Sequence, residues 1–205
     1  MIFETGIYFL FDPLKWKKKP WEKYLREIFP YICAIQLRTS VNYDKAIYDI
    51  GVKLKQKINK TKIKLIINNR ADIAQAVNAD GVHLGEKDLP VEEVRKYFRG
   101  IIGASRHTIK GAKQAEEKGA RYIGCGPVFK PISKKVDRKE IGIKGYLKVK
   151  RSVKIPVFPI GGINTKNISN LEGLTDIAAV SSAINSSENP IKTCQKIYTF
   201  LGQNK

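Results

Sequence analysis

Short apolar runs recur along the chain at intervals of roughly 20 to 30 residues, and helix-like stretches separate most of them. Each run is apolar almost throughout, which is typical of strands that are buried on both faces and therefore of a parallel sheet. Because parallel neighbours need a crossover connection, usually a helix, this alternation predicts an α/β fold. The runs comprise residues 6–11, 31–37, 63–68, 81–84, 101–104, 122–125, 157–160 and 177–180.

The stretches between the runs have the periodicity of amphipathic helices. Residues 41–58 carry one broad apolar stripe, and the same pattern occurs over residues 91–98, 107–118 and 190–201. An open doubly wound sheet is the alternative to a closed barrel, but it needs a glycine-rich turn after its first strand. The first run is followed by Asp12-Pro13-Leu14 instead. We therefore predict a single (βα)8 TIM-barrel domain over residues 1–205.

The chain has a formal net charge of +19 over 205 residues. Its lysines are scattered over the helical stretches and form no basic arm, so we interpret the excess as a solvated surface that attracts small anions, without nucleic acid as a partner. No window approaches the ~18 consecutive apolar residues of a membrane span, and no signal peptide is indicated. The three cysteines are too widely spaced to indicate a disulfide framework or a zinc site. We expect a cytoplasmic protein with no membrane partner.

Polar residues that follow the predicted strands are the candidates for a functional site, because barrel enzymes build their sites from these residues. Gln36 and Arg38 are two residues apart, so a strand would point them to the same side. A long polar pair there needs partners, and for Arg38 an ion pair with a neighbouring loop is the alternative role. Asn68, Asn69 and Arg70 follow the third run, where either Asn could instead cap the next helix.

The fourth and fifth runs end in further polar groups. His83 lies within the fourth run, where a hydrogen-bonded core histidine is the alternative to a functional one. Asp88 follows this run and could bind a ligand or cap the next helix. Ser105, His107 and Thr108 follow the fifth run, and the hydroxyl groups could bind an anion or cap a helix.

Three more loops complete the predicted mouth of the barrel. The sixth run is followed by a long polar loop, residues 130–138, and loops of this length without secondary structure are often functional. Glycines after the seventh strand, and small residues with a helix start after the eighth, form a phosphate-binding device in many barrels, because backbone N–H groups can approach an anion there. The predicted mouth carries the cations Arg38, Arg70 and Lys134 and very few carboxylates, so it predicts a small phosphorylated substrate. The residues that these three loops contribute are Ser133, Lys134, Gly161, Gly162, Ser181 and Ser182.

Seven ordered motifs resemble those of the thiamine phosphate synthase family, which also contains the TenI-type thiazole tautomerases. The resemblance extends from about residue 6 to residue 202. It implies a transferase that joins a hydroxymethylpyrimidine diphosphate to a thiazole phosphate or its carboxylate, through a pyrimidine methylene cation, and releases pyrophosphate. It also implies Mg²⁺ as the cofactor. The motifs are Gln36-Leu37-Arg38, Asn68-x-Arg70, Gly81-Val82-His83-Leu84-Gly85 with Asp88-Leu89, Gly103-x-Ser105-x-His107-Thr108, Gly126-Pro127-Val128-Phe129, Pro159-Ile160-Gly161-Gly162-Ile163-Asn164 and Val180-x-Ser182-Ala183-Ile184.

The family's site residues carry over onto matching positions of this chain. The thiazole phosphate would contact three places, which are Ser133 in the loop that precedes Lys134, then Gly162, and then the Ser181-Ser182 turn. Magnesium would be held by the residues at positions 69 and 88, which are Asn69 and Asp88. We include Ser40, Arg70, His107 and Gly161 in the predicted substrate site because they follow strand ends. The pyrimidine diphosphate would meet Gln36, Arg38, Asn68, Ser105 and Lys134, of which Arg38, Ser105 and Lys134 form the predicted catalytic set.

Three departures from the family pattern fall within this site. Ser40 stands where the family usually has Lys, and Pro131-Ile132 replaces a Thr and a Ser that contact phosphate. Asn69 stands where the family usually has Asp, and a neutral amide holds Mg²⁺ more weakly than a carboxylate does. We hypothesise that Arg106 and Lys130 supply part of the missing positive charge.

Two other functions are open alternatives. A TenI-type tautomerase also lacks the Asp after the third strand, but the family's tautomerase His lies in a Gly-His-Val-Phe motif, where this chain has Pro127. A non-catalytic barrel that binds phosphate or nucleic acid could use the +19 charge, but the chain has no basic arm or interleaved aromatic residues. The sequence leaves the oligomeric state, including a homodimer, undetermined.

Overall fold

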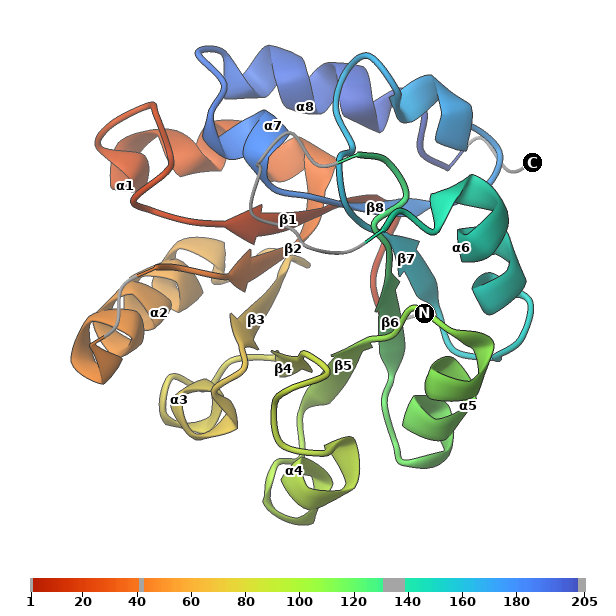
Figure 1. Ribbon diagram of the computed structural model, residues 1–205. Helices are drawn as coiled ribbons and strands as arrows, with labels where there is room; N and C mark the ends of the chain where they lie inside the picture. Colours follow the sequence, from red (N-terminus) through yellow and green to blue (C-terminus); the bar gives the residue numbers. More distant parts are fainter. Residues whose placement is uncertain (1, 41–42, 131–138, 203–205) are drawn as a thin grey trace.

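The computed structural model describes residues 2–40, 43–130 and 139–202. Eight parallel strands form one sheet in the order β7-β6-β5-β4-β3-β2-β1-β8. An isolated bridge between Ile160 and Ala179 joins the β7 end of this sheet to β8, so the sheet closes into a barrel (Figure 1). The predicted (βα)8 fold is therefore confirmed. The strands are β1 (Gly6–Phe11), β2 (Ile32–Leu37), β3 (Lys64–Asn68), β4 (Gly81–Leu84), β5 (Ile101–Ser105), β6 (Tyr122–Cys125), β7 (Val157–Pro159) and β8 (Ile177–Val180).

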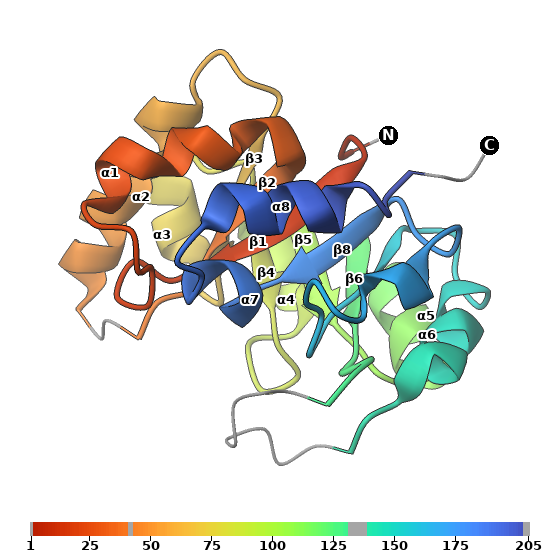
Figure 2. The same cartoon turned by 90° about the horizontal axis from the view of Figure 1, so that it is seen from above.

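Helices cover the outside of the barrel (Figures 1 and 2). Two short 3-10 helices, η1 (Leu25–Tyr31) and η2 (Ile168–Leu171), also belong to this outer layer. The α-helices are α1 (Trp21–Tyr24), α2 (Asp44–Ile58), α3 (Ala71–Ala76), α4 (Val91–Tyr97), α5 (Ile109–Glu117), α6 (Gly142–Lys150), α7 (Ser182–Asn185) and α8 (Pro190–Tyr198).

The outer layer differs from the prediction in several places, and α1 and η1 are among the elements that were not predicted. Helix α6 is absent from the predicted helices, because two glycines and two β-branched residues in nine positions give it a weak helical signal. Burial of Tyr146 and Val149 stabilises it in the fold. Between β7 and β8 a full helix is replaced by the single turn η2, which buries Ile168 and Leu171.

The core has an outer layer between strands and helices and an inner layer inside the barrel. Strand β1 shows the division, because Phe9 packs in the outer layer while Tyr8 and Leu10 pack in the inner one. Aromatic rings fill much of the inner layer, where Tyr122 stacks on Phe158 with 5.1 Å between ring centroids. The closed end of the barrel is therefore apolar and packed, and polar strand ends are left for the mouth.

Among the described residues, we find no helix with the length and apolarity that crossing a membrane would require. Cys33, Cys125 and Cys194 are buried and form no disulfide. Burial raises the pKa of each thiol to about 12. These cysteines therefore behave as small apolar residues.

Candidate functional site

The ends of β2 and β3 present two amides that bind each other. Gln36 is only 2 % exposed, and its Nε2 donates to Asn68 Oδ1 at 2.6 Å. The expected partner of this buried polar side chain is thus the predicted site residue on the next strand. Arg38 and Ser40 follow at the exposed rim, and the Arg38 backbone N–H donates to the Phe11 carbonyl at 2.9 Å. Strand pairing therefore places Arg38 at the mouth beside β1.

Asn69 adopts a left-handed backbone conformation with φ of 66°. Asn tolerates this conformation better than most residues do. Its N–H donates to the His83 carbonyl at 2.8 Å, which fixes the end of β3 beside β4. Its side chain is exposed at the mouth. The N-cap residue of α3 is Arg70, and no side chain caps this helix, so the alternative that Asn68 or Asn69 is a cap is wrong.

Arg70 binds two carboxylates at the starts of α2 and α3. Its guanidinium donates to Asp44, with Nη2 at 3.0 Å from Oδ2, and to Asp72, with Nε at 2.9 Å from Oδ1. Hydrogen bonds with these carboxylates raise the pKa of Arg70, and those with Arg70 lower the pKa of Asp44 and of Asp72. The predicted substrate contact of Arg70 stays a prediction, and in this structure the side chain joins two helices.

His83 and Ser105 connect β4 to β5 at the inner edge of the mouth. His83 is 6 % exposed, its Nε2 lies 2.9 Å from Ser105 Oγ, and its Nδ1 lies 3.0 Å from the Tyr122 hydroxyl. The imidazole is therefore hydrogen-bonded on both sides. Burial, followed by the charges of Arg38 and Arg106, lowers the pKa of His83 to about 3. Both guanidinium groups are thus close enough to the mouth to act on its electrostatics.

This shift predicts an acid-sensitive fold. The pKa of His83 is depressed in the folded state, so the stabilisation is complete above its ordinary value of about 6.5 and is lost as the pH falls towards 3. From pH 7 to pH 5 we expect the free energy of unfolding to drop by about 2 kcal/mol more in the unaltered chain than in His83→Gln. Urea unfolding at the two pH values measures this difference. His107→Gln should retain the loss, and an equal drop in His83→Gln would contradict the assignment.

The loop after β4 holds the predicted metal ligand Asp88. Its Oδ2 accepts a hydrogen bond from the Gly85 N–H at 2.5 Å, and among the described residues no hydrogen bond is formed by Oδ1. Pro90 is the N-cap residue of α4, and no side chain caps that helix. The alternative role of Asp88 as a helix cap is therefore wrong. One carboxylate oxygen is committed to the loop, and the other is available to a cation.

His107 and Thr108 lie at the start of α5. Thr108 Oγ1 accepts from the Gly111 N–H at 3.1 Å, so the capping interpretation holds for this hydroxyl. His107 Nε2 lies 3.8 Å from Glu86 Oε1, across the loops that follow β4 and β5. This position borders the mouth, and a substrate contact of His107 stays a prediction.

The glycine pair after β7 is packed closely against the loop that follows β6. Gly161 and Gly162 have φ of 97° and 68°. A Cβ on Gly161 would lie 2.6 Å from Pro127 Cβ, and one on Gly162 would lie 2.6 Å from the Phe129 carbonyl oxygen. The side-chain amides of Asn164 and Asn167 both donate to the Gly162 carbonyl at 2.9 Å. This turn therefore requires glycine and is held rigidly in place.

The turn after β8 is tied to β1. Asn185 is 1 % exposed, and its Nδ2 donates to the Leu10 carbonyl at 2.8 Å while its Oδ1 accepts from the Asp12 N–H at 3.1 Å. Ser181 Oγ lies 3.3 Å from the same Leu10 carbonyl, whereas Ser182 is exposed. The Ser181 hydroxyl is thus turned towards β1, which leaves Ser182 and the first N–H groups of α7 for an anion. Ser133 and Lys134 lie outside the described residues.

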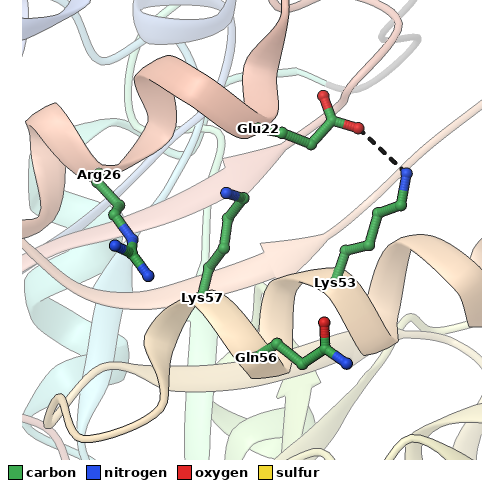
Figure 3. Close-up of a pocket in the computed structure, with 5 residues that line it drawn as sticks. All are labelled: Glu22, Arg26, Lys53, Gln56 and Lys57. Carbon is green, nitrogen blue, oxygen red and sulfur yellow. Dashed lines mark hydrogen bonds and ion pairs between the residues drawn. The ribbon is translucent and has the colours of Figure 1, made fainter.

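A separate surface depression lies on the outer flank, between the α1–η1 segment and α2 (Figure 3). Glu22 and Lys53 form an ion pair across it, with 3.2 Å between Oε1 and Nζ. None of its lining residues belongs to the predicted site. The lining residues are Glu22, Arg26, Lys53, Gln56 and Lys57. Among the described residues, no group of three or more His, Cys, Asp or Glu side chains could hold a metal ion.

Tyr8 and Tyr122 are polar neighbours of the site that the sequence did not single out. Both lie inside apolar runs, where a tyrosine is indistinguishable from other core aromatics. The one available signal is Gly103, which pairs with Tyr122 between β5 and β6 and leaves room for its ring. A glycine opposite an aromatic residue in a buried strand indicates a close approach of this kind.

Comparisons with known proteins agree with this arrangement. A family model described as thiamine monophosphate synthase matches residues 8–184. The chain is 40 % identical to the thiamine-phosphate synthase of Clostridium tetani over 172 residues, 82 % of each chain. It is 42 % identical to that of Pyrococcus horikoshii over 154 residues, 74 % of each chain. A solved thiamine phosphate pyrophosphorylase from Pyrococcus furiosus superposes with a TM-score of 0.85 at 34 % identity, over 96 % of this chain and 95 % of that one. The chain therefore belongs to the thiamine monophosphate synthase family and is a transferase.

Proposed function

We propose that this chain joins a hydroxymethylpyrimidine diphosphate to a thiazole phosphate and forms thiamine phosphate and pyrophosphate. The observation that carries the proposal is the junction of four neighbouring strands at the mouth. Gln36 binds Asn68 across β2 and β3, and His83 binds Ser105 across β4 and β5. The positive charges of Arg38 and Arg106 both lower the pKa of His83, so they act on the same edge. Neutral donors around a cationic rim suit a diphosphate.

The residues present support a dissociative reaction. Loss of diphosphate from the pyrimidine methylene carbon leaves a ring-stabilised cation, and the thiazole nitrogen supplies the electron pair that forms the new C–N bond. The diphosphate departs with the electron pair of the broken C–O bond. Arg38, the Ser105 hydroxyl and Lys134 would stabilise its developing charge, while the Gln36–Asn68 pair would orient the pyrimidine. No general base is needed in this step.

Mg²⁺ fits the donor set at the ends of β3 and β4. Asn69 offers an exposed amide oxygen, and Asp88 offers the carboxylate oxygen that Gly85 does not occupy. Mg²⁺ prefers oxygen ligands and often takes one or two carboxylates with waters and substrate phosphates, so two protein ligands suffice. When bound, Mg²⁺ would supply positive charge against the diphosphate. A single carboxylate predicts weak binding without substrate.

The thiazole phosphate would lie on the opposite side of the mouth. There the Gly161-Gly162 turn and the start of α7 offer backbone N–H groups, and Ser182 is exposed beside them. We expect Ser133, which lies outside the described residues, to complete this subsite. This arrangement would hold the two substrates on facing sides of the barrel. A cytoplasmic location, a homodimer and the absence of nucleic-acid and membrane partners stay predictions.

The test is an assay with pyrimidine diphosphate, thiazole phosphate carboxylate and Mg²⁺. Thiamine phosphate formed at a catalytic rate would support the proposal, and we expect Arg38→Gln to lower kcat/KM about 100-fold because a charge on the departing diphosphate loses its partner. The matched control is Arg151→Gln, which removes an exposed guanidinium beyond the end of α6. Isomerisation of the thiazole alone, without thiamine phosphate, would instead identify a tautomerase.

A further inference from the structure

Four side chains form a continuous hydrogen-bonded chain from the barrel interior to its mouth. The Tyr8 and Tyr122 hydroxyl oxygens are 2.5 Å apart, and the Tyr122 hydroxyl lies 3.0 Å from His83 Nδ1. His83 Nε2 in turn lies 2.9 Å from Ser105 Oγ. The chain crosses β1, β6, β4 and β5, so it connects the inner core directly to a predicted catalytic residue.

The inner end of this chain is enclosed by rings. Tyr8 is 2 % exposed and Tyr122 is 1 % exposed. Phe3 and Phe158 pack against both rings. A Cβ at position 103 would lie 2.0 Å from Tyr122 Cζ and 2.3 Å from its hydroxyl oxygen. The Tyr122 side chain therefore fits only because position 103 is a glycine.

The direction of the hydrogen bonds follows from the supply of acceptors. Among the described residues, the Tyr8 hydroxyl has a hydrogen bond to Tyr122 alone. Its hydrogen is buried and must be donated to Tyr122, since a buried donor without an acceptor is costly. Tyr122 must then donate to His83 Nδ1. His83 is left with its hydrogen on Nε2, which donates to Ser105 Oγ.

Both other protonation states leave one tyrosine hydrogen without an acceptor. With a hydrogen on Nδ1, His83 would donate to Tyr122, and the contact between Tyr8 and Tyr122 could then satisfy only one of their two hydroxyl hydrogens. A doubly protonated imidazole would have the same consequence. In the neutral Nδ1–H form the Ser105 hydroxyl would also be used up, because it would donate to Nε2. The direction of these hydrogen bonds therefore decides whether the Ser105 hydroxyl can donate at the mouth.

We propose that Tyr122 is a positioning residue, which fixes His83 as the Nε2–H tautomer and thereby reserves the Ser105 hydroxyl hydrogen for an acceptor at the mouth. The identity of that acceptor rests on the proposed function. A hydroxyl that accepts from the His83 N–H keeps its own hydrogen to donate to an anionic oxygen, such as one of a departing diphosphate. Ser105 would thus be an oriented donor before substrate arrives.

Long-range ¹H–¹⁵N correlation spectra of the full chain test the tautomer directly. The chain contains two histidines, so a His107→Gln sample assigns the His83 signals. We expect a protonated Nε2 and an unprotonated Nδ1, in the unaltered chain and in Tyr8→Phe, where Tyr122 keeps its role as donor to His83. Tyr122→Phe should populate both tautomers. A protonated Nδ1 in the unaltered chain would overturn the proposal, whether or not the chain makes thiamine phosphate.

Kinetics test the consequence for Ser105. We expect Tyr122→Phe to lower kcat about tenfold and to change KM less than about twofold, because the donor is misoriented only part of the time. In a Ser105→Ala background, the same change should have no further effect. Tyr146→Phe is the matched control. The buried Tyr146 hydroxyl donates to the backbone carbonyls of Val157 and Leu174 and is not part of the hydrogen-bonded chain from Tyr8 to Ser105. Additive effects of Tyr122→Phe and Ser105→Ala would overturn the link between Tyr122 and Ser105.

Discussion

Replacing Gly162 with alanine is expected to raise the KM for the thiazole phosphate at least about tenfold and to lower the free energy of unfolding by about 2–4 kcal/mol. The new Cβ would lie 2.6 Å from the Phe129 carbonyl oxygen and 2.7 Å from that of Lys130. These are backbone atoms, so the loops after β6 and β7 would have to move apart. The turn proposed to hold the phosphate would be displaced with them.

Gly142→Ala separates this clash from the cost of the backbone conformation. Gly142 has φ of 65°, close to the 68° of Gly162, but an added Cβ there meets no described atom within 4 Å. The control should therefore lose only about 1 kcal/mol, from the left-handed backbone alone, and should leave KM unchanged. Chemical unfolding and initial-rate kinetics of both variants measure the difference. If the two variants changed the free energy of unfolding and KM equally, the close packing after β7 would have no role in the site.

The strands of this barrel could be predicted from the sequence because a strand that is buried on both faces consists of a short continuous run of apolar residues. The predicted runs 6–11, 81–84, 122–125 and 177–180 coincide with β1, β4, β6 and β8. The helices could be predicted less completely. Helix α6, for example, depends on contacts with the barrel and not on its own helical propensity. Where an element is stabilised by distant neighbours, a local pattern carries little of the signal.

The site shows the same division between local and distant information. Polar residues at strand ends identified Gln36, Asn68 and Ser105, but not the partner of each. Arg70 binds Asp44, which is 26 residues upstream, and Tyr8 binds Tyr122 at a separation of 114 residues. These contacts depend on strand register and on which face of a strand points inwards. A shift of register by one residue would exchange the two faces.

Asn69→Asp should bind Mg²⁺ about tenfold more tightly and raise turnover at limiting Mg²⁺, because the number of carboxylates at the ends of β3 and β4 rises from one to two. The backbone at this position already suits the change. The Asn69 N–H is bonded to the His83 carbonyl at 2.8 Å, so the substituted side chain would stay beside the loop that holds Asp88. Calorimetric titration of the free protein with Mg²⁺ reports the affinity independently of activity.

Asn78→Asp provides the matched control for this substitution. Asn78 is also left-handed, with φ of 52°, and is exposed after α3, away from the predicted metal ligands. Both variants replace an amide with a carboxylate in the same backbone conformation, so a general effect of the added charge on Mg²⁺ would occur in both. A gain confined to Asn69→Asp would place the metal between positions 69 and 88. An equal gain in Asn78→Asp, or none in either, would count against that placement, because a direct ligand must act through its own contact with the ion.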